Sequence, residues 1–321
     1  RDRSVSRGLG DVYKRQPDQI VISNGGKHSL TNIFTALINP GDEVIIPAPF
    51  WLSYPEIVKL AGGVPVIVKT TKEQNYKLTV DDLKAAITDK TKALVLNTPN
   101  NPTGMLYTEE ELRAIAEVVV ANDFYVVADE MYENLVYGEQ KHVSIASLGK
   151  DIYDRTITCS GVAKSYAMTG WRIGYTGSSK EIAKMMGSVQ SHQTSNPNSI
   201  AQKATVEALN GPQDSVAAMH DEFDKRRKYM YERIQKMPLV SCIEPMDVFV
   251  DAGEVLDKSY KGEKVGTVAR MAEILINEYN TAVVPCADFG FDDHLRLSYA
   301  ISIEQIEKGL DRIESFLKGL E

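Results

Sequence analysis

One lysine has an unusual setting in this sequence. Residues 160–175 read SGVAKSYAMTGWRIGY, so Lys164 is surrounded by small, apolar and aromatic residues, with no acidic neighbour in this segment. Lysine ordinarily keeps its ammonium group in water. Burial among such residues would remove part of that solvation, lower the pKa of the amine and free it to act as a nucleophile. Lys164 is therefore a candidate for covalent chemistry.

Other residues able to do chemistry accompany this lysine. Asp129 ends the apolar run YVVAD, Gly25 and Gly26 precede a helical pattern, and Arg172 and Arg296 stand in or beside strand-like segments. Each has an ordinary explanation by itself, because an aspartate can cap a helix, a glycine pair can form a tight turn and an arginine can form a salt bridge. Together with the lysine, however, they match the needs of one cofactor, pyridoxal 5′-phosphate.

This cofactor needs three kinds of protein group. Its aldehyde reacts with a lysine amine, its phosphate binds N–H groups at a helix start together with a cation, and its pyridine nitrogen needs a carboxylate that keeps it protonated. We expect Lys164, the Gly25–Gly26 turn with Arg172, and Asp129 to supply these groups in turn. The sequence therefore predicts a pyridoxal-phosphate site.

Short β-rich apolar runs alternate with helical patterns over the first two thirds of the chain. This alternation predicts an α/β fold with a mostly parallel sheet covered by helices. Ligands collect at the carboxyl ends of such strands, where most of the candidate residues stand. The predicted strands are 19–23, 43–47, 65–69, 93–97, 125–129 and 156–160, and the predicted helices include 28–38, 80–87 and 108–122.

The last third of the chain has a different pattern. GPQDS at 211–215 precedes a charged amphipathic helix expected over 216–237. We therefore predict a large cofactor-binding domain over 17–215, and a linking helix with a small α+β domain over 216–321. Residues 1–16 are basic and poor in apolar residues, so we expect a leader foreign to the fold; a basic targeting arm is the alternative. The small domain is predicted to hold strands near 248–251, 282–285 and 294–300 and helices near 265–279 and 302–317.

Composition limits the classes of partner. The 321 residues carry a formal net charge of −8, which argues against nucleic acids and anionic membranes and leaves small molecules. Cys159, Cys242 and Cys286 lack the spacing of a disulfide framework or a zinc site, so we expect no metal and a reducing cytoplasm. No apolar run is long enough to cross a bilayer.

Several segments together resemble one known family. In order along the chain, they are similar to signature segments of the class I, aspartate-aminotransferase-like pyridoxal-phosphate aminotransferases of fold type I, and above all to the bacterial aspartate aminotransferases that carry GGK at the first turn. The family ordinarily has a further N-terminal segment, so we expect this chain to be an N-terminally truncated form. The segments are PDQIVISNGGKHSLTNIF, PGDEVIIPAPFWLSYPE, LNTPNNPTG, VVADEMYENLVY, SGVAKSYAMTGWRIGY and HLRLSYA.

The resemblance implies a role for each residue around the cofactor ring. Lys164 would be the lysine that binds the cofactor and later carries a proton, and Asp129 the partner of the pyridine nitrogen. Tyr132 and Asn101 would hydrogen-bond the 3-oxygen of the ring. Trp51 would stack on the ring, and its alternative reading is a core tryptophan. Trp51 and Asn101 would also contact the substrate.

The resemblance also implies the phosphate and substrate contacts. The Gly26 and Lys27 backbone amides, Ser160 and Arg172 would hold the phosphate, although Ser160 stands four residues before the lysine, unlike the SxSK form of other members. Arg296 would bind the substrate α-carboxylate through a bidentate fork. The Lys27 side chain would meet the distal carboxylate of a dicarboxylic substrate, or else face the surface or the phosphate.

The function implied is transamination by a cytoplasmic homodimer. The amino group of an L-amino acid, aspartate or glutamate first, would pass to a 2-oxo acid. Three alternatives stay open: β-elimination of sulfur amino acids or transamination of aromatic, alanine or prephenate-type substrates on the same fold, a regulatory domain that binds the cofactor without catalysis, and an inactive fragment.

Overall fold

The computed structural model describes residues 14–244 and 248–321. Its largest element is a seven-stranded sheet in the order β1-β7-β6-β5-β4-β2-β3, in which β7 runs antiparallel to its neighbours and the other strands are parallel to one another. The predicted α/β class is therefore confirmed. The strands are β1 (Ile20–Ser23), β2 (Glu43–Ala48), β3 (Val64–Lys69), β4 (Thr91–Asn97), β5 (Tyr125–Asp129), β6 (Thr156–Gly161) and β7 (Gly174–Gly177).

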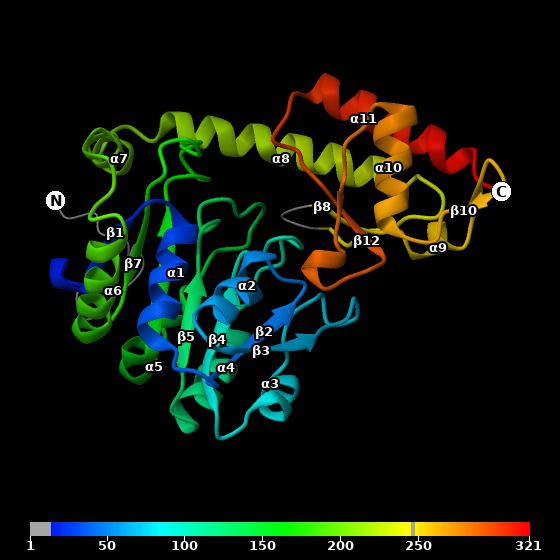
Figure 1. The fold of residues 1–321 in the computed structure, drawn as a ribbon. Helices are drawn as coiled ribbons and strands as arrows, with labels where there is room; N and C mark the ends of the chain where they lie inside the picture. The colour runs from blue at the N-terminus through cyan, green and yellow to red at the C-terminus, as the bar shows by residue number, and fades with distance from the viewer. Residues whose placement is uncertain (1–13, 245–247) are drawn as a thin grey trace.

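Helices cover both faces of this sheet (Figure 1). Alternate residues of one strand enter different clusters, since Ile46 packs with α1 and α2 on one side while Ile45 packs with α3 and α4 on the other. This burial on two faces explains why the strands read as nearly continuous apolar runs. The covering elements are η2 (Pro17–Gln19), α1 (Gly26–Leu37), α2 (Ser53–Leu60), α3 (Val80–Ala86), α4 (Glu109–Ala121), η3 (Ile145–Ser147), α5 (Lys150–Arg155), α6 (Lys180–Gln193) and α7 (Ser199–Asn210).

Local sequence explains where individual helices begin. The hydroxyl of Thr108 accepts from the amide of Glu111, and the Glu111 carboxylate accepts from the amide of Thr108, so a capping box with an acidic first turn starts α4 as predicted. Thr79 and Asp82 form the same arrangement at α3. In contrast, Gly25 precedes α1 with no side-chain cap, which leaves the first backbone N–H groups of α1 without a side-chain acceptor.

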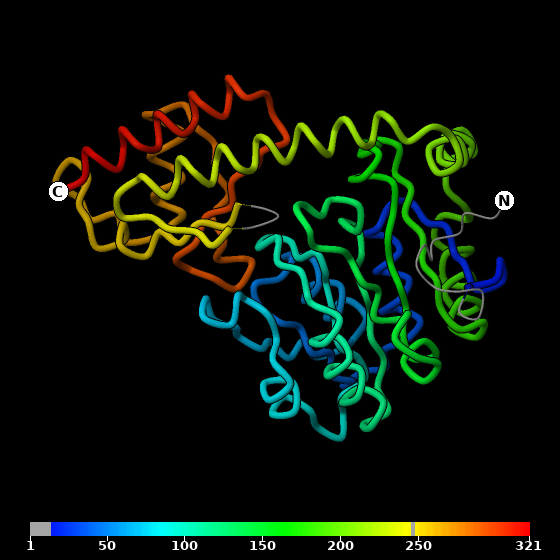
Figure 2. The backbone as a smooth tube through the Cα atoms, turned by 180° about the vertical axis from the view of Figure 1, so that it is seen from behind, coloured from blue at the N-terminus to red at the C-terminus, as the bar shows by residue number. Residues whose placement is uncertain are grey.

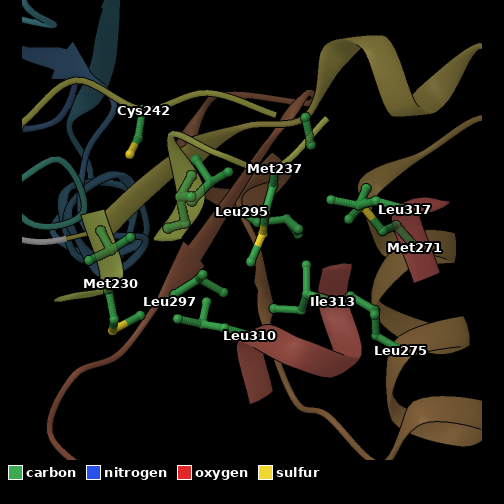
Figure 3. Packing of buried hydrophobic residues seen from close by; sticks show 14 of the residues in the cluster. Met230, Met237, Cys242, Met271, Leu275, Leu295, Leu297, Leu310, Ile313 and Leu317 are labelled. Carbon is green, nitrogen blue, oxygen red and sulfur yellow. The ribbon is translucent and has the colours of Figure 1, made fainter. Parts of the chain in front are cut away.

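The C-terminal part forms a second core around a small antiparallel sheet, β11-β12-β8. Apolar side chains from α8, β12, α10 and α11 converge there, including Met230, Leu295, Leu275 and Ile313 (Figure 3). The elements are α8 (Asp214–Ile234), β8 (Val248–Asp251), α9 (Gly253–Leu256), β9 (Ser259–Tyr260), β10 (Glu263–Lys264), α10 (Val268–Tyr279), β11 (Val284–Pro285), η4 (Ala287–Phe289), β12 (His294–Leu297) and α11 (Ile303–Lys318).

Helix α8 connects the two parts. It runs from the neighbourhood of α7 to the C-terminal sheet, as the views from both sides show (Figures 1 and 2). Its first residues lie near the large sheet, and its last residues, such as Met230 and Ile234, are buried in the C-terminal core. This helix begins and ends slightly earlier than the predicted 216–237.

Several elements differ from the prediction. Strand β7 was not predicted, because GYTG has only four residues and two of them are glycine. The strand predicted over 294–300 ends at Leu297. Of the predicted leader, residues 1–13 lie outside the described residues. Arg15, however, donates to the carbonyl oxygens of Tyr153 and Thr156 at 2.6 and 2.8 Å, so the end of that segment packs on the large sheet.

Candidate active site

A cavity of about 650 Å³ lies at the carboxyl ends of β4, β5 and β6, where the large sheet meets the C-terminal part. Nearly all of the residues singled out in the sequence line it, although they come from segments far apart along the chain. They are Gly26, Lys27, Trp51, Asn101, Asp129, Tyr132, Lys164, Arg172 and Arg296, whereas Gly25 and Ser160 do not line it.

Lys164 follows β6 and reaches into this cavity. Its Nζ lies 5.5 Å from the centre of the Tyr132 ring. The expected loss of solvation is wrong for this structure: Ala163 and Ser165 are buried, whereas the Lys164 side chain between them is exposed.

Asp129 ends β5 and is buried at the bottom of the cavity. Its Oδ2 accepts a hydrogen bond from the hydroxyl of Tyr54 at 2.7 Å, and its Oδ1 accepts from the amide of Met131 at 3.1 Å. Burial raises the pKa of Asp129 to about 6, although these two hydrogen bonds act in the opposite direction. The carboxylate is thus held in place but poorly solvated, which suits a cationic partner.

Two asparagines connect Asp129 to the substrate side of the cavity. The amide group of Asn97 donates to the backbone oxygen of Asp129 at 2.9 Å, and its oxygen accepts from the backbone amide of Asn101 at 2.8 Å. The side-chain oxygen of Asn101 then accepts from Nη1 of Arg296 at 2.9 Å. Arg296 comes from β12, so this contact joins the two parts of the molecule across the cavity.

The start of α1 forms an anion-binding corner. Gly25 has a φ of 88°, and a Cβ placed there would lie 2.4 Å from Nη2 of Arg172. A Cβ on Gly174 would lie 2.5 Å from the Gly25 carbonyl carbon. Glycine at 25 therefore lets the guanidinium lie directly against the uncapped N-terminus of α1, where backbone N–H groups and the helix dipole attract a phosphate, and glycine at 174 lets β7 pack against the same turn.

Trp51 and Lys27 border the same cavity from another side. The Nζ of Lys27 lies 5.0 Å from the centre of the Trp51 ring, and Lys27 is exposed. Trp51 also meets the ring of Tyr54 edge-on, with the ring centres 5.5 Å apart. Because Trp51 packs against two apolar clusters as well as the cavity, it is partly a core residue, as the alternative reading held.

The structure places Ser160 differently from the prediction. Its hydroxyl points to the turn after β5, where it donates to the backbone oxygen of Glu130 at 3.4 Å and to Oε1 of Glu133 at 3.2 Å. Ser160 is fully buried and does not line the cavity. A phosphate contact is therefore wrong for this residue, whose side chain instead holds the turn that carries Tyr132.

Sequence reasoning missed two residues of the site. Tyr54 reaches Asp129 because α2 places it one helical turn after Trp51, and Asn97 holds Asn101 because it is the last residue of β4. The available signal was position, since each stands beside a motif already singled out. A tyrosine and an asparagine also have many structural uses, so position was a weak signal.

Among the described residues, none of the helices has both the length and the apolar character that a membrane span requires.

Comparisons with known proteins identify the family. A model of the family described as aminotransferase class I and II matches residues 6–313, which includes most of the segment expected to be a foreign leader. An aspartate aminotransferase of Bacillus sp. (strain YM-2) is 45% identical over 321 residues, covering 98% of this chain and 82% of that protein. An aspartate/prephenate aminotransferase of Cereibacter sphaeroides is 43% identical over 327 residues, with coverages of 98% and 82%.

Solved structures agree with the sequence relatives. The crystal structure of an aspartate aminotransferase from Rhizobium meliloti matches with a TM-score of 0.92 and 37% identity, covering 96% of this chain and 78% of that chain. Both the fold around the cavity and the sequence over nearly the whole chain therefore agree with one family. The chain belongs to the class I and II aminotransferases, as the resemblance of its segments predicted.

Proposed function

We propose that this chain transfers the amino group of aspartate or glutamate to a 2-oxo acid, with pyridoxal 5′-phosphate held in the cavity described above. One observation carries the proposal: a single cavity is bordered by an amine at Lys164, a buried carboxylate at Asp129, an anion-binding corner at Arg172 and an arginine fork at Arg296. Each group matches a different part of the cofactor or of an amino acid substrate.

The described residues fit this cofactor. The corner between Gly25, Gly174 and Arg172 has no room for a Cβ, yet it presents N–H groups and a cation to the cavity. Among the described residues, the buried Asp129 carboxylate has hydrogen bonds to Tyr54 and Met131, and neither of these is a cation. A protonated pyridine nitrogen would provide that charge, and it would lower the pKa of Asp129 again.

When bound, pyridoxal phosphate supplies an electron-accepting ring that stabilises negative charge at the substrate α-carbon. The protein groups then have separate tasks. Lys164 would carry the proton that leaves the α-carbon at its Nζ, and Asp129 would keep the ring nitrogen protonated. Tyr132 and Asn101 border the same space and would hydrogen-bond the 3-oxygen, while Trp51 would cover one face of the ring.

Arg296 would orient the substrate. A guanidinium binds a carboxylate through two parallel hydrogen bonds, which fixes the position of the α-carbon as well as the affinity. The Nη1 contact with Asn101 holds the guanidinium in place. Lys27 lies beside Trp51 at the cavity wall and would attract a second, distal carboxylate, which favours aspartate and glutamate over neutral amino acids.

Prephenate is a second candidate acceptor. One relative, 43% identical to this chain, is named an aspartate/prephenate aminotransferase. Prephenate carries a 2-oxo acid group and a further carboxylate, so it presents the same two charges that Arg296 and Lys27 would meet.

We further propose that the protein is a homodimer and that it acts in the cytoplasm. We also propose that the chain divides into two domains at about residue 215. A shallow hollow beside the anion-binding corner supports the dimer, because it shares Arg172 with the cavity and is lined by the exposed Trp171 and Ile200. A second copy that covers these side chains would also close the phosphate end of the site. The separate C-terminal core supports the division into domains.

The decisive experiment is chemical trapping at Lys164. The full chain is loaded with pyridoxal phosphate, and its absorbance is followed while aspartate, glutamate, alanine and phenylalanine are added in turn. We expect a prompt change with the two acidic substrates. Borohydride treatment before substrate should attach the cofactor to the peptide that contains Lys164, and Lys164→Ala should lower turnover at least about 100-fold. An unmodified peptide would refute the proposal.

A further inference from the structure

Strand β12 has two different faces. Leu295 and Leu297 enter the C-terminal core, whereas His294 and Arg296 alternate with them and occupy the opposite face. His294 is buried and stacks on Phe249 of β8, with ring centres 4.4 Å apart. Residues two apart on a strand point to the same face and have a fixed relative position. A contact that holds His294 in place therefore also holds the backbone of Arg296 in place.

That contact comes from the large sheet. Tyr76 lies in the loop after β3, and its hydroxyl oxygen is 2.8 Å from Nε2 of His294. The other ring nitrogen, Nδ1, is 2.6 Å from Oδ1 of Asp293. The Tyr76 ring also meets Phe249 and Phe291 edge-on, with ring centres 5.2 and 5.5 Å apart. A loop of one part therefore inserts a hydrogen-bonded aromatic side chain into the other.

The chemistry of the three groups gives one consistent set of hydrogen bonds for a neutral histidine ring. An ionised carboxylate can only accept, so Nδ1 carries the proton that is shared with Asp293. In a neutral ring Nε2 is then the acceptor, and the hydroxyl of Tyr76 donates to it. Burial raises the pKa of Tyr76, with Asp251 and Asp293 adding to the effect, so the hydroxyl keeps its proton over the working range of pH.

The loop is built to hold Tyr76 in this position. Asn75 and Tyr76 both have a φ of 53°, a left-handed conformation that residues with a side chain rarely adopt. The amide of Tyr76 donates to the carbonyl of Thr71 at 2.8 Å and closes the loop. Lys72 of the same loop lies 3.4 Å from a carboxylate oxygen of Asp251, which provides a second attachment to the C-terminal sheet.

We infer that Tyr76 is a positioning residue, which sets through His294 where Arg296 stands over the cavity. The inference rests on the proposed function, in which Arg296 binds the substrate α-carboxylate. Tyr76 does not line the cavity, so it would not touch the cofactor. Loss of its hydroxyl would leave His294 with a buried, unpaired acceptor and loosen the attachment of β12 to the loop, which weakens carboxylate binding without altering cofactor chemistry.

The test is Tyr76→Phe in the full chain loaded with pyridoxal phosphate. The ring stays in the aromatic cluster and only the hydroxyl is lost. We expect KM for aspartate to rise about three- to tenfold, the range that one neutral hydrogen bond provides. The dissociation constant of maleate, a dicarboxylate without an amino group, should rise equally, while kcat stays within about twofold of the parent. The affinity and absorption of the cofactor should not change.

The matched control is Tyr107→Phe. The Tyr107 hydroxyl accepts from the amide of Leu78 at the end of the same loop, at 2.8 Å, and among the described residues it has no hydrogen bond to β12. This control should lose stability and keep the parent KM. An equal rise in KM in Tyr107→Phe would overturn the inference, because the effect would then follow from the stability of the loop. A parent-like KM and maleate affinity in Tyr76→Phe would overturn it too.

A second pair of variants gives an independent test at the half-exposed Asp293. Asp293→Ala removes the acceptor that fixes the His294 tautomer and should raise KM, whereas Asp293→Asn keeps an oxygen that can accept from Nδ1 and should restore the parent value. A parent-like Asp293→Ala would contradict the inference. If the parent itself gives no response to aspartate, the proposed function fails instead; if it responds, these variants test the role of Tyr76 alone.

Discussion

At the scale of single residues, Asp129 combines a charge with nearly complete burial. Its pKa of about 6 in the folded chain lies above the value of about 3.9 for an exposed aspartate. Between these two values the folded chain holds a proton that the unfolded chain has lost. Stability therefore falls as the pH rises through this window, and the full cost of about 3 kcal/mol is present above about pH 6.

This cost predicts the behaviour of Asp129→Asn. Without cofactor, the variant should be more stable than the parent at pH 8, by up to about 3 kcal/mol, and most of this difference should disappear near pH 4, where the folded carboxyl is protonated and about half of the unfolded carboxyls are. Urea unfolding of the cofactor-free proteins at the two pH values measures it. An equal difference in stability at the two pH values would show that the buried charge of Asp129 does not destabilise the folded chain.

Arg296→Lys tests the substrate fork. An ammonium group cannot form the two parallel hydrogen bonds of a guanidinium, so kcat/KM for aspartate should fall about 10- to 100-fold. Steady-state kinetics with aspartate measures it. Arg312→Lys is the control, because Arg312 lies exposed on α11 and donates to the carbonyl of Asn280. Unchanged kinetics in Arg296→Lys would remove this residue from the substrate site.

At the scale of elements, the uncapped start of α1 determines the phosphate corner. A helix that begins with a Ser or Thr cap satisfies its own first N–H groups, as α4 does with Thr108. Helix α1 begins after Gly25 instead, and its place at the carboxyl edge of the sheet directs those groups into the site. Because Gly25 has no side chain to cap α1, these N–H groups stay available to a phosphate.

Gly25→Ala should show this function. The added Cβ would strain a left-handed backbone and push against Arg172, so we expect a loss of stability of about 1–2 kcal/mol together with weaker binding of pyridoxal phosphate. Gly41→Ala is the matched control, since Gly41 has a φ of 90° but no atom within 4 Å of an added Cβ. The control should lose similar stability and keep cofactor affinity; equal cofactor affinity in both variants would contradict the role of the corner.

The sequence predicts the elements whose residue pattern follows directly from their burial. Runs such as ALVLN at 93–97 appeared as strands because burial on two faces leaves no polar alternation. Strand β7 was not visible, because its pairing with β1 and β6 comes from tertiary contacts and not from its own four residues. The cavity residues could be found from motif positions, but the direction of a side chain could not.

Ser160 and Lys164 show this limit at the site. Ser160 alternates with its neighbours on β6, and only the final packing shows that its hydroxyl faces Glu133 and not the cavity. The small neighbours of Lys164 predict a loss of solvation, yet Ala163 and Ser165 are buried while the Lys164 side chain is exposed. The residue types around a position show what its neighbours are, but they do not show whether its own side chain points into the core or into the cavity.

At the scale of the whole molecule, the exposed hollow near Arg172 predicts assembly. Ile200 is 71% exposed and Trp171 46%, although both are large and apolar. If a second copy covers them, Ile200→Glu should shift the protein from dimer to monomer in sedimentation velocity and weaken cofactor binding. Leu60→Glu is the control, because Leu60 is 85% exposed at the end of α2, outside the hollow. A dimer that persists in Ile200→Glu would place the interface elsewhere.

Helix α8 links the two parts of the molecule, so a small tilt at one end would displace the other end. Its 21 residues correspond to a rod about 31 Å long, and a tilt of about 5° at its first turn would swing the far end by about 2.7 Å. That swing is close to the length of one hydrogen bond. A tilt of this size would therefore be enough to form or break the hydrogen bonds between Arg296 and a substrate carboxylate.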